Sequence, residues 1–227
     1  MGSQQNISSL KSSPILILLG PQGSGKGTQA RFLVKKYHLQ YLATGDIFRE
    51  IAKKNTPLGK QIANYLNAGN LIPNDIMMAI FEKKLKSIDI PHGILFDGMP
   101  RTLNQAQLLD KMLSELNHPL PMVIYLRIKR QTAIDRSIKR RICINCNNTY
   151  LPGEPSYTRG ICDNCGGKVI SRSDDTPKVI ANRLDQYYTE TEPVTDYYRR
   201  NHRLIEIDGE PPVGEVTQKI ITHLEQL

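Results

Sequence analysis

Short apolar runs recur along the chain and alternate with longer stretches in which apolar residues are three or four positions apart. The runs lie at residues 15–19, 94–96, 123–126 and 204–207, and a further one is expected near 41–42. Helical spacing occurs in the series Leu103, Leu108, Leu109, Met112, Leu113 and Leu116, and again in Val216, Ile220, Ile221 and Leu224. Short buried strands that alternate with helices predict an α/β fold, with a parallel sheet covered by helices on both faces.

The segment 44–73 interrupts this alternation. It predicts short helices with no strand between them. The stretch "TGDIFREIAKKN" opens with Thr44 as a helix cap, and "LGKQIANYLNAG" ends at Gly69. We interpret this segment as an insertion into the sheet domain.

The segment 142–175 is a second interruption, rich in Gly, Pro, Cys, Asn and Ser. A plain loop of this length is rare in a compact domain, so the segment predicts a lid, a binding loop or a small domain of its own. A helix then begins in "SDDTPKVIANRL", with Asp175 or Thr176 as its cap and Pro177 in the first turn.

A glycine-rich turn follows the first apolar run in "ILILLGPQGSGKGTQA". Gly20, Gly25 and Lys26 have the spacing G-x-x-x-x-G-K. Glycines let successive backbone N–H groups point inward at an anion, and the next helix adds its positive N-terminal end. A turn without a ligand has similar glycines, but the preceding strand and the following helix favour a polyphosphate site in which Lys26 reaches the outer phosphates.

The residue after this lysine departs from the general motif, which has Ser or Thr there as a magnesium ligand. Gly27 follows Lys26, and Thr28 comes one position later. Magnesium must therefore be held differently. Asp97 ends the apolar stretch "GILFDG" and is the candidate, acting through water, although an Asp before Gly98 is also an ordinary turn former.

All four cysteines lie in the second interruption, as two C-x-x-C pairs: Cys143, Cys146, Cys162 and Cys165. Two thiolate pairs at this spacing suit a tetrahedral, closed Zn²⁺ site, with iron, a disulfide or incidental cysteines as alternatives. Their pattern favours a reducing compartment, so the expected location is cytoplasmic. A metal would replace the hydrophobic core that so short a segment cannot build.

The composition of the chain limits the classes of function and partner that remain. The chain has 227 residues, 39% of them hydrophobic, which is enough for one well-buried core. Its apolar runs are far shorter than a bilayer span, so no membrane partner is expected. The net charge of +8 permits nucleic acid as a partner, but the basic residues are dispersed apart from "KRR" at 139–141, and the chain has no Trp. Anionic small molecules are the preferred explanation, and no nucleic-acid partner is expected.

The runs "GPQGSGKGTQA", "TGDIFR" at 44–49 and "DGMPRTLNQA" at 97–106 together resemble the adenylate kinases. The resemblance extends from about residue 15 to the C-terminus, and the cysteine-rich segment is similar to the four-cysteine lid of some bacterial members. It implies reversible, Mg²⁺-dependent phosphoryl transfer from ATP to AMP, giving two ADP, in adenine nucleotide homeostasis. It also implies a monomer.

The same resemblance divides the chain into parts. It implies a P-loop NTPase-like core made of residues 14–43, 74–138 and 176–227. An AMP-binding insert would occupy 44–73, and a zinc-bearing lid would occupy 139–175. Residues 1–13 are expected to form a disordered leader.

Site residues follow by matching positions to the family's motifs. The implied ATP contacts are Gly23, Ser24, Gly25, Lys26, Gly27, Thr28, Arg136, Arg140, Thr149, Tyr150 and Pro211. The implied AMP contacts are Thr44, Arg49, Asn70, Leu71, Ile72, Gly98, Met99, Pro100, Arg101, Gln105, Arg172 and Arg183, with Gln105 reading the adenine edge. The catalytic set is Lys26, Arg101, Arg140, Arg172, Arg183 and Asp97. Phosphoryl transfer needs two anions aligned and their charge neutralised, a task that suits arginines.

Two other functions compete with this interpretation. One is a kinase for another nucleoside monophosphate, UMP or CMP, against which Gln105 and the long cysteine segment argue. The other is a zinc-ribbon module that binds nucleic acid. The ribbon lacks a basic face, since Arg159 is the only Lys or Arg between Cys143 and Cys165.

Overall fold

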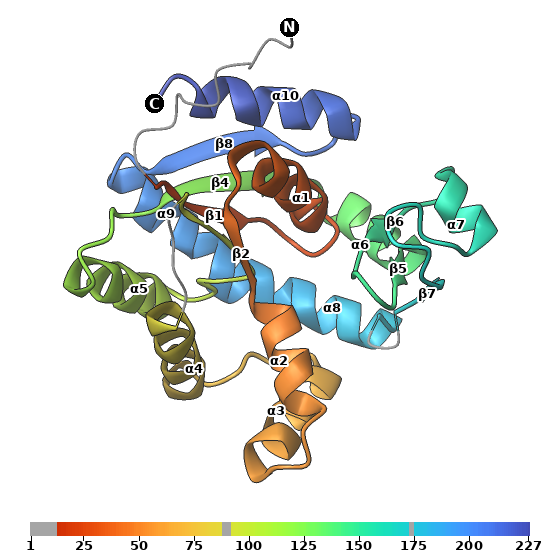
Figure 1. Cartoon of the computed structure of the whole chain (residues 1–227), viewed down its shortest axis with the longest axis horizontal. Coiled ribbons are helices and arrows are strands. Elements are labelled where there is room, and N and C mark those ends of the chain that lie inside the picture. Colours follow the sequence, from red (N-terminus) through yellow and green to blue (C-terminus); the bar gives the residue numbers. More distant parts are fainter. Residues whose placement is uncertain (1–12, 88–91, 173–174) are drawn as a thin grey trace, which may run out of the picture.

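The computed structural model describes residues 13–87, 92–172 and 175–227. The leader predicted at 1–13 therefore lies outside the described residues except for Ser13. The described chain has a central sheet, helices on both of its faces, and two projecting segments (Figure 1).

Five parallel strands form the central sheet in the order β2-β3-β1-β4-β8. They are β1 (Ile15–Leu19), β2 (Gln40–Ala43), β3 (Ile94–Asp97), β4 (Met122–Arg127) and β8 (Leu204–Asp208). Every predicted strand is present, including the one near 41–42, so the predicted parallel α/β sheet is confirmed. Because β3 extends to Asp97, that carboxylate lies at the carboxyl end of a central strand, where parallel sheets bind their ligands.

Alternate residues of β1 pack on opposite faces of the sheet. Ile15, Ile17 and Leu19 belong to the core that includes helices α4 (Asn74–Lys86), α5 (Leu103–Glu115) and α9 (Glu192–Arg200). Leu16 and Leu18 belong to the core beneath α1 (Lys26–Tyr37) and α10 (Val213–Leu224). Both faces are covered, which explains why the strands read as continuous apolar runs.

The first insertion consists of α2 (Thr44–Ala52) and α3 (Pro57–Ala68), two helices with no strand between them, as predicted. Gly69 ends α3 in the left-handed region, at φ 74°, also as predicted. The prediction that Thr44 caps α2 is wrong. Ala43 occupies that position, and the Thr44 hydroxyl donates instead to the carbonyl oxygens of Asp97 and Gly98, at 3.2 and 3.1 Å.

The insertion contacts helix α8 (Pro177–Gln186) through the end of α3. The Asn182 side-chain amide donates to the carbonyl oxygen of Ala68 at 2.9 Å. This bond satisfies one of the unpaired carbonyls that every helix has at its C-terminus.

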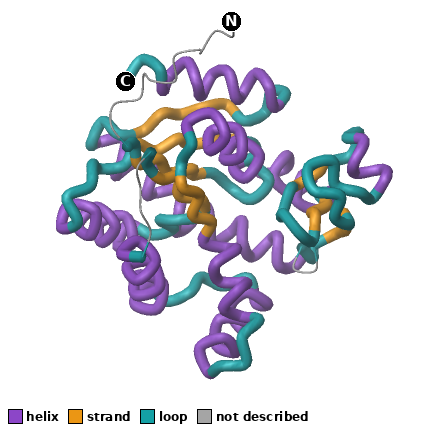
Figure 2. Tube along the Cα trace, in the orientation of Figure 1, coloured by secondary structure: helices purple, strands orange, loops and turns teal. Residues whose placement is uncertain are grey.

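The second insertion follows α6 (Arg130–Lys139) and forms a small antiparallel sheet of its own, in the order β6-β5-β7. Its strands are β5 (Arg141–Cys143), β6 (Thr149–Tyr150) and β7 (Val169–Ser171), with the short helix α7 (Pro155–Arg159) between β6 and β7. Figure 2 shows it as a compact loop-rich unit beside the main body. Among the described residues, its buried hydrophobic cluster consists of Cys143, Tyr150, Cys162 and Val169, too few for a conventional core.

The chain returns from the second insertion into α8, whose N-terminal cap is Thr176; its hydroxyl accepts from the N–H of Val179 at 3.3 Å. Asp175, the other predicted cap, instead accepts hydrogen bonds from the side chains of Gln22 and Arg140. A single π-helical turn, η1 (Tyr187–Thr191), then joins α8 to α9. Along the described ranges, none of the helices combines the length and the apolarity that crossing a bilayer requires.

Candidate active site

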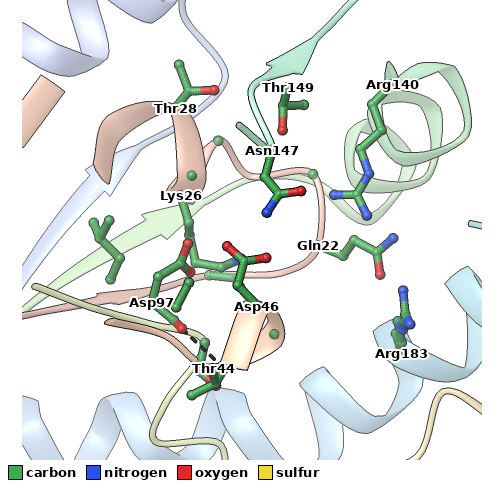
Figure 3. A pocket seen from close by; sticks show the side chains of 18 of the residues that line it. Gln22, Lys26, Thr28, Thr44, Asp46, Asp97, Arg140, Asn147, Thr149 and Arg183 are labelled. Carbon is green, nitrogen blue, oxygen red and sulfur yellow. Dashed lines mark hydrogen bonds between the residues drawn. The ribbon is translucent and has the colours of Figure 1, made fainter. Parts of the chain in front are cut away.

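A cavity of about 760 Å³ lies where the glycine loop, the two insertions and the turn after β3 meet. Its volume suits one or two small organic ligands. Figure 3 shows side chains from these distant segments pointing into the same space. Most of the site residues expected from the sequence line it: Gly23, Gly25, Lys26, Gly27, Thr28, Thr44, Arg49, Asn70, Leu71, Ile72, Asp97, Gly98, Pro100, Arg101, Gln105, Arg136, Arg140, Thr149, Tyr150, Arg172 and Arg183.

The glycine loop leads into α1 with its backbone exposed to the cavity. Gly25 precedes the helix at φ 96°, and neither a side-chain cap nor an acidic residue occupies the first turn of α1. Gly23 has φ 82°, and a Cβ there would lie 2.7 Å from the carbonyl oxygen of Ala133. The first N–H groups of α1 therefore remain available to an anion.

Lys26 is the cation nearest this loop. Its Nζ donates to the carbonyl oxygens of Gly20 and Pro21, at 2.7 and 2.9 Å. Burial lowers its pKa to about 8; Asp97 opposes this shift, while Arg101 and Arg140 add to it. An ammonium group that has lost hydration and lies among other cations is well placed to bind a multiply charged anion.

Asp97 faces Lys26 from the end of β3, as Figure 3 shows. One carboxylate oxygen, Oδ2, accepts a hydrogen bond from the Tyr41 hydroxyl at 2.8 Å. A Cβ on Gly27 would lie 3.9 Å from this oxygen, so the carboxylate adjoins the bare first turn of α1. Burial raises the pKa of Tyr41, and the charge and hydrogen bond of Asp97 raise it further, which keeps the phenol a donor.

Arg101 is fixed from three sides at the turn after β3. The side-chain Nε of Arg101 donates to the carbonyl oxygen of Gly98 at 2.8 Å. The backbone N–H of Arg101 donates to Oε1 of Gln105 at 2.6 Å. The Thr191 hydroxyl, from η1, donates to the carbonyl oxygen of Arg101 at 2.9 Å. Burial lowers the pKa of Arg101, Arg183 and Arg49 add to the effect, and Asp97 opposes it.

Asp175 holds two further arginines, Arg140 and Arg183, and its side chain is only 4% exposed. Oδ2 accepts from Nε of Arg140 in a very short contact, and Oδ1 accepts from Nη2 of the same residue at 2.8 Å. Oδ1 also lies 3.5 Å from Nη1 of Arg183 and accepts from Gln22 of the glycine loop at 3.0 Å. One buried carboxylate thus joins the start of the lid, α8 and the phosphate loop.

Arg49 and Arg136 are held by local partners. Arg49 pairs with Asp46, one turn earlier in α2. Arg136 donates to the carbonyl oxygens of Gly209 and Glu210, at 2.9 and 3.1 Å. Both guanidinium groups line the cavity.

Gln105 already uses part of its hydrogen-bonding capacity within the protein. It is 1% exposed, and its Oε1 is bound to Arg101 while its Nε2 donates to Asn74 at 2.7 Å. The second Nε2 hydrogen and the second Oε1 lone pair are the capacity left for a base. The side chain therefore also positions Arg101.

Three of the expected contacts do not line the cavity: Ser24, Met99 and Pro211. Met99 is fully buried in the core between the sheet and α5, so its side chain packs rather than faces a ligand. Ser24 is also buried, and Val213 rather than Pro211 reaches the cavity. Any contact of these three residues with a ligand would therefore come from the backbone rather than from the side chain.

Several lining residues were not found by sequence reasoning, among them Gln22, Arg31, Tyr41, Asp46 and Asn147. Gln22 and Asp46 lie inside recognised motifs, where proximity alone could have suggested them. Tyr41 could have been inferred from strand alternation, because it pairs with Leu95 and so lies on the same sheet face as Asp97, two residues further.

The four cysteines converge in the second insertion, with all four Sγ atoms within 4.8 Å of one another. Two of the separations are 3.4 Å (Cys143 to Cys165) and 3.5 Å (Cys146 to Cys162). A tetrahedron with Zn–S bonds of about 2.3 Å has edges of about 3.8 Å, so the set fits that ion. Burial would raise the pKa of Cys162, but its hydrogen bonds with the Tyr150 hydroxyl and with backbone N–H groups outweigh this effect and lower the pKa to about 6.

Tyr150 links this cluster to the cavity. Its hydroxyl lies 3.1 Å from Sγ of Cys162, donates to Asp163 and accepts from Asn148 at 2.9 Å. Because the same residue lines the cavity, a metal in the cluster would stabilise one wall of the ligand site.

A parallel sheet, a phosphate loop with its lysine, and several arginines that line the same cavity define a class of protein: the P-loop kinases that transfer a phosphoryl group between two nucleotides. The sequence model described as "Adenylate kinase" matches residues 18–203. The chain belongs to the adenylate kinase family.

The curated relatives align with this chain over almost their whole length. The adenylate kinase of Alkaliphilus oremlandii is 42% identical over 210 residues, covering 92% of this chain and 97% of that protein. Those of Fervidobacterium nodosum and Carboxydothermus hydrogenoformans are 42% and 40% identical. They cover 88% and 93% of this chain, and 93% and 99% of their own lengths.

Asp175→Ala should lower the free energy of unfolding by about 3 kcal/mol, because it removes the buried partner of two guanidinium groups that are 14% and 18% exposed. Urea unfolding measures this loss. Hydrogen exchange should also become faster in residues 141–171, since Arg140 starts the lid. Asp185→Ala is the matched control on α8: its pair with Arg130 is exposed, and we expect a change below about 1 kcal/mol. Equal losses in both variants would contradict the role of Asp175.

Proposed function

We propose that this chain transfers the terminal phosphoryl group of MgATP to AMP, reversibly, and gives two ADP. The observation that carries the proposal is one cavity whose walls include the phosphate loop, both insertions, the turn after β3 and several guanidinium groups. Such an arrangement aligns two anions whose phosphates meet head to head.

On the donor side, the backbone N–H groups of residues 23–28 bind the β- and γ-phosphates, and Lys26 binds between the leaving and transferred groups. The support is the uncapped N-terminus of α1 and the location of Nζ beside the loop. Arg136 and Arg140 bind the same phosphates from α6 and the lid base. Thr149, Tyr150 and the backbone near Pro211 flank the adenine.

On the acceptor side, Arg49 and Arg101 bind the phosphate of AMP, and residues 70–72 with the turn 98–101 enclose its base. Thr44 supports this pocket by tying α2 to the end of β3. Gln105 binds the adenine edge with the hydrogen-bonding capacity that Arg101 and Asn74 leave to it.

The transfer step needs no covalent group from the protein. Arg101, Arg140, Arg172 and Arg183 neutralise charge on the phosphoryl group as it moves between two oxygens, and the lid excludes water that would otherwise hydrolyse ATP. Asp175 sets the position of Arg140 and Arg183 before substrate binds, because it already holds both. Phosphate oxygens then take over part of the hydrogen bonding that this carboxylate provides.

The residues present fit a magnesium ion that enters with ATP. Asp97 lies beside the bare first turn of α1, and within the described part of the chain its Oδ1 accepts no hydrogen bond. Asp97 would hold water molecules of the ion's hydration shell, in the place of the missing Ser or Thr after Lys26. When bound, the ion would neutralise negative charge on the phosphates.

The four cysteines fit a structural Zn²⁺, with no position left for substrate or water. Its task would be to hold β5, β6 and β7 as one body, because the hydrophobic cluster of the lid has just four buried members among the residues that the structure describes. We also propose that the chain acts as a monomer in the cytoplasm. A cavity built from segments of one chain and four thiols suited to a reducing environment support these two points.

The activity is tested by a coupled assay of phosphoryl transfer from MgATP to AMP, CMP, UMP and GMP. AMP should be the best acceptor by at least tenfold in kcat/KM, because the pocket offers Gln105 to an adenine edge. A higher value with CMP or UMP would replace the proposal with the pyrimidine alternative. No transfer to any acceptor by fully metallated protein would overturn it.

Lys26→Met should lower kcat by roughly 10²–10³-fold, because it removes a charge that acts on the transferred phosphoryl group. The melting temperature should remain close to that of the wild type, since the side chain contributes charge rather than packing. Lys36→Met is the control: it removes an exposed lysine of the same helix, which pairs with Glu225 and lies over the Tyr37 ring. Ordinary turnover in Lys26→Met would contradict the role of Lys26.

Cys146→Ser should reduce zinc content to well below one ion per chain and lower the melting temperature by several degrees, because a closed site loses one of four ligands. Elemental analysis and calorimetry measure the two effects. Ser171→Ala, an exposed change on β7 of the same lid, should alter neither. An unchanged melting temperature in Cys146→Ser would show that the cluster has no structural role.

A further inference from the structure

The proposed phosphoryl transfer does not by itself explain why Tyr41 lies in the site. It belongs to β2, the edge strand next to β3, and pairs with Leu95 in the parallel register. Alternation along the strands puts Tyr41 and Asp97 on the same face of the sheet. The tyrosine also lines the cavity beside Lys26 and Arg31.

The Tyr41 hydroxyl is the hydrogen-bond donor to the Asp97 carboxylate. Its oxygen lies 2.8 Å from Oδ2, a normal length for an O–H···O⁻ bond. This contact occupies one carboxylate oxygen and leaves Oδ1 for other partners. A tyrosine on the edge strand β2 therefore orients the carboxylate at the end of β3, next to the phosphate loop.

The orientation matters because strong competing partners are close. Lys26 and Arg101 both feel the charge of Asp97. Lys26 and Asp97, which both belong to the described residues, nevertheless form no ion pair, and Nζ donates to the loop carbonyls instead. A carboxylate released from Tyr41 could rotate toward these cations and neutralise charges that phosphate binding needs.

We infer that Tyr41 is a positioning residue for the metal of the reaction: its hydroxyl holds Asp97 so that Oδ1 faces the hydration shell of a divalent cation on the nucleotide. This inference rests on the proposed role of Asp97. It adds a hydrogen-bond donor that supports that carboxylate. Loss of such a supporting contact typically lowers metal affinity by 10–100-fold. Tyr41 itself contacts neither the metal nor the phosphates.

The test measures Mn²⁺ binding to the complex of the full chain with the β,γ-imido analogue of ATP, by the electron paramagnetic resonance signal of free Mn²⁺. Tyr41→Phe keeps the ring and removes only the hydroxyl. We expect the dissociation constant for Mn²⁺ to rise roughly tenfold. Affinity for the analogue without metal should stay within about twofold of the wild type.

The matched control is Tyr37→Phe, because the Tyr37 hydroxyl is buried on α1 and has no hydrogen-bond partner among the described residues. It should bind Mn²⁺ like the wild type. Asp97→Asn is the reference variant and should weaken Mn²⁺ binding at least as much as Tyr41→Phe. Melting temperatures of all variants identify any general loss of structure.

Steady-state kinetics supply a second readout. In Tyr41→Phe the Mg²⁺ concentration for half-maximal rate should rise roughly tenfold, KM for AMP should stay unchanged, and high Mg²⁺ should restore most of kcat. A merely structural role for the tyrosine would not give a defect that added metal corrects.

The outcomes separate the two hypotheses. Weak Mn²⁺ binding in Asp97→Asn together with wild-type binding in Tyr41→Phe would overturn the role of Tyr41 and leave that of Asp97 intact. Wild-type binding in both would overturn the role of Asp97, and the inference would fail with it. An equal defect in Tyr37→Phe would show that the effect is not specific to the Asp97 contact, and would also overturn the inference.

Discussion

The structure depends on holding several like charges around one cavity. Lys26, Arg101, Arg140 and Arg183 line the same space, and burial makes their mutual repulsion stronger than it would be in water. Two buried or half-buried carboxylates offset this repulsion: Asp97 at the end of β3, and Asp175 at the start of α8. Without them, the set of cations that suits two phosphorylated substrates would be costly to assemble in a folded chain.

One of these carboxylates, Asp175, also connects the second insertion to the sheet domain. Asp175 binds Arg140 at the base of the lid and Gln22 in the phosphate loop, so the lid's anchor and the donor site share one contact. The first insertion is tied to the same helix through Asn182. Helix α8 therefore contacts both insertions, and π-helical η1 at its end contacts Arg101 through Thr191. A π-turn at this place agrees with the frequent occurrence of such turns at functional sites.

Much of the fold could be predicted because its signals are local. The buried strands 15–19, 94–96, 123–126 and 204–207 read as apolar runs, and Gly69 and Thr176 end and begin helices by their own conformational or hydrogen-bonding properties. The phosphate loop and the four cysteines could be predicted for the same reason, since the spacing of their members along the chain carries the chemistry. Thr44 shows the limit of such reasoning. It has the composition of a helix cap, yet its hydroxyl bonds to the end of β3, more than fifty residues away.

By itself, the sequence determined the class of fold, the place of the phosphate loop, the arginines available to the site and a cysteine set of metal-binding spacing. Only the tertiary structure decided which carboxylate faces which cation and that Met99 is buried in the core. It also decided that Gln105 is partly used to hold Arg101 and that Tyr41 donates a hydrogen bond to Asp97. The physical reason is that a glycine turn or a cysteine pair acts through neighbours in the chain. A hydrogen bond between a tyrosine on one strand and an aspartate on the next depends on strand order and register, which form only when the whole sheet assembles.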